Sequence, residues 1–285
     1  MKVPIFRSLC LLLLPAFASA DVLGEARALY ERTDYQASLR VLAATSTPET
    51  TGYLLTGKNY FMLGDYSKAA HSFEKAASLS PHSPECELWL GRAYGKRAET
   101  GTVLLAPVYA SKARQHFERA AALDPHYAEA SNDLFDYYLN APAILGGGLE
   151  KAEAIARRIA VERPPESHFE LAQIAERRKQ YADAETHLRR AVDLAPGQAG
   201  RILDLARYLA RRGRLAESDA LFEQAREMAP GDPRIAFARA KTYIEQRRNR
   251  EETRRLLHEY LASTLTPDDP PKADAQKLLR QAAGE

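Results

Sequence analysis

The stretch that decides the fold is Thr50–Ser83, TTGYLLTGKNYFMLGDYSKAAHSFEKAASLSPHS. Two apolar-periodic segments flank a glycine-aspartate turn, and the small residues Gly57 and Ala69 stand where these segments would cross closely. Phe73 supplies bulk to fill the space between neighbouring units. Pro81 ends the second segment because proline lacks the amide that a continuing helix needs. The stretch therefore predicts two amphipathic helices joined by a short turn.

The same skeleton recurs at 165–198 and at 199–232, and the closing prolines Pro196 and Pro230 are 34 residues apart. In this period and pattern the chain resembles the tetratricopeptide-repeat family. A single helix pair cannot bury its apolar faces alone, so neighbouring pairs must stack. The resemblance implies an all-α, right-handed superhelical solenoid that binds protein partners.

Seven helix pairs can be drawn along the mature chain, 21–285, in this register. They span about 21–49, 50–83, 84–127, 128–164, 165–198, 199–232 and 233–266. A capping helix is expected at 271–283, where Ala275, Leu278 and Leu279 would cover the exposed end of the stack.

The first twenty residues have the layout of a cleaved signal peptide. Lys2 and Arg7 give a positive start, Leu9–Leu14 form a short apolar run, and Ala18-Ser19-Ala20 offers small residues before Asp21. The alternative is a membrane anchor, but the run is far shorter than the ~20 residues of a spanning helix. We therefore expect an exported bacterial protein, located in the periplasm, without a transmembrane anchor after cleavage.

Charge and cysteine content argue against several classes of partner and site. The chain has 40 basic and 38 acidic residues, and removing Lys2 and Arg7 with the signal leaves 38 of each. Net charge thus gives no support for nucleic acid as a partner. Only Cys86 remains after cleavage, so no internal disulfide and no cysteine–histidine metal site is expected. We expect no cofactor and no metal.

Two consecutive pairs are interrupted, the third within Arg97–Ala110 and the fourth at Ala141–Gly148. Both insertions are expected in the turn inside a pair, and such turns align along one edge of a stacked array. This edge is a candidate partner surface, with Leu104, Tyr109 and Leu145 as contact residues. The alternative is that the insertions pack against each other.

A second candidate surface is a basic ladder at the ninth position of the first helix of each pair. Five of its seven members are basic: Arg27, Lys58, Arg92, Arg207 and Lys241. In the family this position commonly faces the concave groove, so the ladder predicts an acidic protein segment as partner. The alternative is an ordinary solvated face whose charges pair with their neighbours.

No nucleophile motif, phosphate-binding loop or histidine ligand set occurs in the sequence. We therefore expect no enzyme, and a protein–protein interaction scaffold or adaptor is the favoured function. One alternative is an accessory factor for envelope assembly, serving the cell wall, cytochrome maturation or the outer membrane. Another is an enzyme or small-ligand receptor that uses the groove. The oligomeric state and the partner's identity stay open.

Overall fold

The computed structural model describes residues 16–44 and 49–283. Within these ranges the chain forms fifteen α-helices and one short 3₁₀ helix, and no strand. The all-α fold class is thus confirmed.

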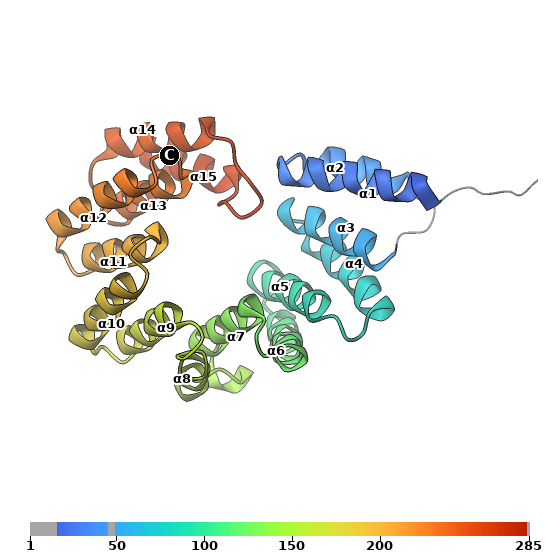
Figure 1. The fold of residues 1–285 in the computed structure, drawn as a ribbon, viewed down its shortest axis with the longest axis horizontal. Helices are drawn as coiled ribbons and strands as arrows, with labels where there is room; N and C mark the ends of the chain where they lie inside the picture. The colour runs from blue at the N-terminus through green and yellow to red at the C-terminus, as the bar shows by residue number, and fades with distance from the viewer. Residues whose placement is uncertain (1–15, 45–48, 284–285) are drawn as a thin grey trace, which may run out of the picture.

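The helices follow one another as seven pairs and a terminal helix (Figure 1). The first helices of the pairs are α1 (Ala16–Glu31), α3 (Thr50–Met62), α5 (Pro84–Thr100), α7 (Ala128–Asn140), α9 (Pro164–Arg177), α11 (Ala199–Arg211) and α13 (Pro233–Glu245). The second helices are α2 (Tyr35–Ala43), α4 (Tyr66–Leu79), α6 (Ala106–Leu123), α8 (Leu149–Arg158), α10 (Tyr181–Leu194), α12 (Leu215–Met228) and α14 (Arg250–Ala262). The terminal helix is α15 (Lys272–Ala283).

Local chemistry sets where these helices begin. The Asp65 carboxylate accepts the amide of Lys68 at 3.1 Å, and the Ser83 hydroxyl accepts the amide of Cys86 at 3.3 Å. Such side-chain caps satisfy amides that the first turn leaves without a partner. Pro84 then occupies the first turn of α5, where a missing amide costs nothing.

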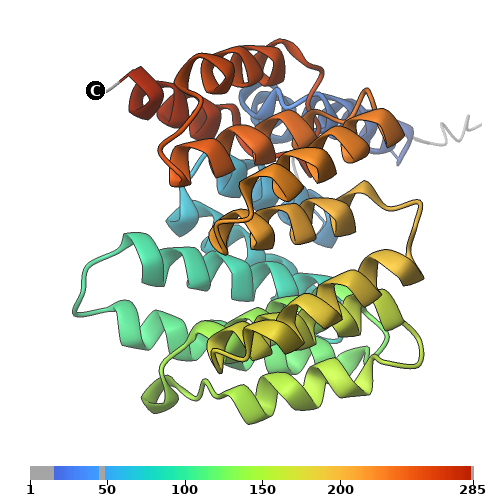
Figure 2. The same ribbon diagram turned by 90° about the vertical axis from the view of Figure 1, so that its left-hand side faces the viewer.

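The pairs stack into a strongly curved solenoid, with the first helices on the concave side in Figure 1. Figure 2 shows the same array from its left-hand side, with the pairs in successive layers. The curvature brings the segment between α14 and α15 close to α1. This proximity is seen in a pocket that both Asp268 and Tyr30 line. Helix α15 buries Ala275 in the core of the last pair, with Leu278 and Leu279 packed against the same core, and so caps the stack.

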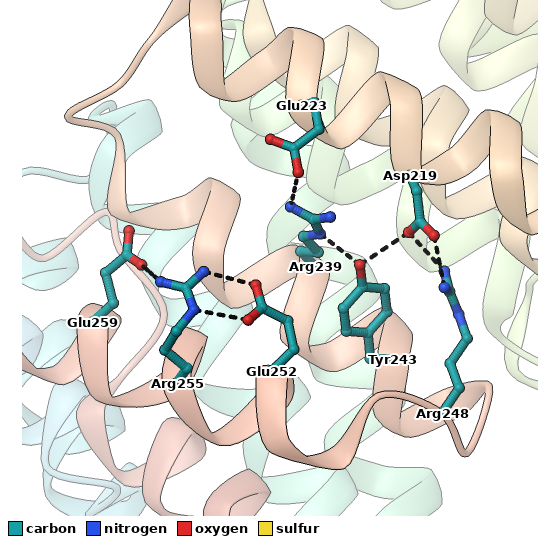
Figure 3. Close-up of polar contacts among 8 residues, drawn as sticks. All are labelled: Asp219, Glu223, Arg239, Tyr243, Arg248, Glu252, Arg255 and Glu259. Carbon is teal, nitrogen blue, oxygen red and sulfur yellow. Dashed lines mark hydrogen bonds and ion pairs between the residues drawn. The ribbon is translucent and has the colours of Figure 1, made fainter.

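A polar network ties α12 to the last pair (Figure 3). Arg248 donates to both oxygens of Asp219, at 2.7 and 2.8 Å, and the Tyr243 hydroxyl donates to Asp219 at 3.0 Å. Arg239 bridges the Tyr243 hydroxyl at 2.7 Å and Glu223 at 2.6 Å. These charge-assisted bonds fix the last pair on its neighbour.

The insertion in the third pair lengthens helices more than it lengthens the turn. Helices α5 and α6 have 17 and 18 residues, against 13 and 14 in α3 and α4. The expectation that the extra residues all lie in the turn is corrected accordingly. The reason is local: the Arg97 guanidinium stacks 4.1 Å from the Tyr109 ring and donates to its hydroxyl at 2.5 Å, which holds the two extended helix ends together.

The fourth pair keeps its insertion as a loop, 141–148, which contains the 3₁₀ helix η1 (Ala143–Leu145). The Tyr137 hydroxyl donates to the Leu145 carbonyl at 2.8 Å. Gly146 adopts φ 88°, a left-handed conformation that favours glycine. The loop therefore folds back onto α7 and α6 rather than projecting freely.

The predicted signal segment lies mostly outside the described residues. Helix α1 begins at Ala16, so it crosses the predicted cleavage boundary after Ala20. Of the helices in the described ranges, none is long and apolar enough to cross a membrane.

Candidate functional site

A pocket of about 950 Å³ occupies the concave side of the solenoid, between its two ends. Tyr30 of α1 and Asp268 of the segment after α14 contribute to one wall. Trp89 and Arg92 of α5 and Asp136 of α7 contribute to the others. Residues of the first, third and fourth pairs therefore meet the segment after α14 in this space. We call it the central pocket.

Trp89 organises one side of the central pocket. The Lys58 ammonium lies 5.0 Å from the indole centroid, and the Arg92 guanidinium lies 4.7 Å from it. The Phe61 ring packs edge-on against the indole, with centroids 5.4 Å apart. Aromatic faces attract cations through their quadrupole, so these contacts hold both basic side chains in place.

Both basic side chains are also paired with carboxylates. Lys58 donates to Glu85 at 2.7 Å. Arg92 donates to Asp133 at 2.5 Å and to Glu129 at 2.8 Å. Burial nevertheless raises the pKa of Asp133, because Arg92 offsets the loss of hydration only in part. Within the pocket, neighbouring carboxylates therefore offset the positive charges of these two members of the ladder.

Acidic residues outnumber basic ones in the lining of the central pocket. The three basic residues are Lys58, Arg92 and Lys96. The seven acidic residues are Glu31, Glu85, Glu99, Glu129, Asp133, Asp136 and Asp268. The formal balance, 3 − 7, is −4. The pocket thus has the opposite sign to the one that the basic ladder suggests.

A carboxyl group without a partner lies behind this lining. Glu170 of α9 is 1% exposed, and neither of its carboxyl oxygens has a hydrogen-bond partner among the described residues. Burial, reinforced by Glu166 and Asp136, raises the pKa of Glu170 to about 8. Asp136 is itself exposed in the pocket, yet the surrounding walls and the neighbouring acids Asp133 and Glu166 raise its pKa to about 6.

Sequence comparison matches three family models to the chain, each described as tetratricopeptide repeat, at residues 51–83, 145–199 and 175–242. The chain is a tetratricopeptide-repeat protein. No curated protein matches it in sequence.

Solved structures with the same fold include a tetratricopeptide-repeat protein from Parabacteroides merdae. It is 14% identical, covers 93% of this chain and 98% of its own, and has a TM-score of 0.61. TTC0263 from Thermus thermophilus is 19% identical, covering 67% and 98%, with a TM-score of 0.54. PilW, a type IV pilus biogenesis factor, is 20% identical, covering 76% and 96%, with a TM-score of 0.53.

The remaining ladder residues of this repeat protein lie elsewhere. Arg207 and Lys241 line a separate pocket of about 250 Å³ further along the concave side, where Arg207 pairs with Asp204. Arg27 and Lys241 are exposed and make no ion pair with the residues that the structure describes. The ladder is therefore spread over the concave side and does not form one continuous positive surface.

The three predicted edge residues also lie in different places. Leu104 is 90% exposed. Tyr109 lines a pocket of about 520 Å³ beside Arg97 and Leu105. Leu145 lines the central pocket instead. The sequence pattern did not single out Trp89, Asp133 or Glu170. Asp133 and Glu170 each occupy the sixth position of their repeat units, 128–164 and 165–198.

Proposed function

We propose that this tetratricopeptide-repeat protein is a non-catalytic scaffold that binds a segment of a partner protein in the central pocket. Tetratricopeptide repeats are protein-interaction modules, and the pocket is the observation that carries the proposal. Its walls come from both ends of the solenoid, and Trp89 offers an aromatic anchor among polar groups. A bound segment would bridge the two ends.

The proposal includes the location. The positive start, short apolar run and small residues before Asp21 support export, with the bacterial periplasm as the destination. PilW, whose fold is similar, is a type IV pilus biogenesis factor. A role in envelope assembly is a narrower form of the same proposal, and the partner's identity would decide it.

Site-specific photo-crosslinking in the native cell envelope tests this function. A photoreactive amino acid would replace Met62, which lines the central pocket, or Leu79, which is 56% exposed and lines none of the pockets described above. We expect a discrete protein adduct at position 62 and none at 79. Equal labelling at both positions, or none at 62, would contradict binding in the pocket.

A second surface has a specific observation in its favour. Val103, Leu104 and Ile144, in the two insertions, are 87%, 90% and 93% exposed. Large apolar side chains this exposed are candidates for partner contact. Leu104→Ser and Ile144→Ser should leave thermal stability unchanged. If they also leave recovery of the crosslinked partner unchanged, this edge plays no part in binding.

A further inference from the structure

At two successive interfaces, the ninth residue of one first helix lies opposite the sixth residue of the next. Lys58, ninth in α3, lies over Trp89, sixth in α5. Arg92, ninth in α5, donates to Asp133, sixth in α7. At two successive interfaces, therefore, a cation from one helix meets an aromatic ring or a carboxylate on the next.

The next interface breaks this pattern. Asp136 is ninth in α7, and Glu170 is sixth in the repeat unit 165–198, which makes it the seventh residue of α9. A carboxylate thus occupies the position that Arg92 fills one pair earlier, and Asp136 lies near enough to Glu170 for its charge to oppose the ionisation of Glu170. Glu170 is 1% exposed and has no hydrogen-bond partner among the described residues. Burying a carboxylate without a compensating group is costly, so this arrangement requires an explanation.

The nearest cations of the chain are engaged elsewhere. Arg158 donates to the Ser131 hydroxyl at 3.1 Å, and Arg163 donates to the Asn132 side chain at 3.0 Å. The neighbouring acid Glu166 accepts from Arg201 at 2.8 Å. The interface therefore carries excess negative charge.

We propose that Asp136 and Glu170 form a subsite for a cationic side chain, a guanidinium or an ammonium, on the segment that the central pocket binds. This proposal rests on the proposed function and specifies the partner's chemistry: a basic segment. Asp136 lines the pocket and Glu170 does not, so Asp136 is the member of the subsite that a bound segment would meet first. The formal charge of −4 in the lining favours the same sign of ligand.

Arg92 shows how such a group would be held. Its guanidinium bridges Asp133 and Glu129, two carboxylates of α7. A planar guanidinium can donate to two carboxylates at once, and it stays charged when it is partly buried. A partner arginine would bridge Asp136 and Glu170 in the same way and would supply the counter-charge that this interface lacks.

Binding at this subsite is coupled to proton release. With no cation bound, the two carboxyl groups retain a proton, as burial and their mutual repulsion dictate. The negative charges of Asp133 and Glu166 favour retention of that proton, and the positive charges of Arg158 and Arg163 oppose its retention. An incoming cation replaces the proton, so affinity for the cation should increase as the pH rises from 6 to 8.

The test uses the full mature chain and a small probe. Acetyl-arginine amide carries the guanidinium, and acetyl-citrulline amide is its neutral analogue. Binding is followed by NMR chemical-shift changes at pH 8 and pH 6. We expect the arginine probe to bind at the α7–α9 interface, more tightly at pH 8, and the citrulline probe not to bind.

Three variants sharpen the test. Asp136→Asn should weaken binding of the arginine probe by about tenfold, the usual effect of losing one charge-assisted hydrogen bond. Asp136→Arg should abolish probe binding and raise the melting temperature, because it recreates the Arg92–Asp133 arrangement. Glu227→Gln removes an exposed carboxylate of α12 that lines none of the pockets described above, and it should leave binding unchanged.

Equal binding of both probes, or unchanged binding in Asp136→Asn, would overturn the subsite. Failure of the scaffold function gives a different result, in which the arginine probe binds but no protein is captured at position 62. If a partner is captured there, its crosslinked segment should contain lysine or arginine. A captured segment without a basic residue would contradict the subsite and leave the scaffold function intact.

Discussion

The backbone of Gly57 lies directly against the ring of Phe73. A β-carbon at position 57 would lie 2.9 Å from the Phe73 Cζ atom and closer still to Cε1 and Cδ1. The same relationship recurs one pair later, where a β-carbon on Gly91 would lie 2.7 Å from the Phe117 ring. The two helices of a pair can cross this closely only because the first helix carries no side chain at the crossing.

We therefore expect Gly57→Leu to destabilise the protein by about 1 to 3 kcal/mol, the usual cost of overpacking a core. Thermal unfolding followed by circular dichroism measures the effect. Gly200→Leu is the matched control, because a β-carbon at position 200 would meet no atom within 4 Å. An unchanged melting temperature in Gly57→Leu would mean that the helices do not cross at this residue.

The fold was predictable from the sequence because its determinants are local. A small residue at the crossing, a bulky residue opposite it and a closing proline recur with the same spacing at 50–83 and 199–232, and the contact between Gly57 and Phe73 lies within a single pair. The charge of the groove was not predictable in this way. The ladder was identified from single helices, whereas the partners Glu85 and Asp133 come from the next pair. Pairing across repeats depends on the stacking register, which only the folded array displays.

The network around Asp219 should dominate the stability of the last pair. Burial opposes ionisation of Asp219, but bonds from Arg248 and Tyr243 prevail and lower its pKa. Asp219→Ala should cost about 1 to 3 kcal/mol, because it leaves Arg248 and Tyr243 without their acceptor. Glu252→Ala, which removes the more exposed pair with Arg255, should change stability by less than about 1 kcal/mol.

The sign of the pH effect follows from the lowered pKa. Ionised Asp219 stabilises the folded state above its pKa in the unfolded chain, about 4, and this stabilisation is lost as the pH falls through its folded pKa. The melting temperature of Asp219→Ala should therefore depend less on pH below about 4 than that of the parent protein. Parallel acid profiles of the two proteins would contradict this assignment.

Glu170 should produce the opposite dependence on pH. Its pKa is raised to about 8, so the folded state binds a proton that the unfolded state releases near pH 4. The contribution of Glu170 to stability should be greatest below about pH 4 and decline until about pH 8. Glu170→Gln carries no ionisable group, so its melting temperature should fall less between pH 5 and pH 8. The comparison uses the change in melting temperature between pH 5 and pH 8 in each protein. The buried amide of the variant shifts the melting temperature equally at both pH values and so does not affect this change.

The export prediction concerns the start of α1. Cleavage after Ala20 would leave Asp21 as the first residue and shorten α1, Ala16–Glu31, to its last eleven residues. The buried residues that anchor α1, Ala26 and Tyr30, both follow the boundary. An acidic residue at the new start also complements the helix dipole. Removal of the signal should therefore leave the first pair intact.

We expect the exported protein to begin at Asp21 and to appear in the periplasmic fraction after osmotic shock. Amino-terminal sequencing and intact mass measure this directly. A purified chain that starts at Asp21 should melt within about 2 °C of the full-length chain. For a protein of this size, such a shift corresponds to a difference of less than about 1 kcal/mol in the free energy of unfolding. Ala18→Gln with Ala20→Gln is the control, because large polar residues at the small positions should block cleavage. An exported protein that still carries Leu11–Leu14 would show that this segment is an anchor, and the pocket would then work at a membrane surface.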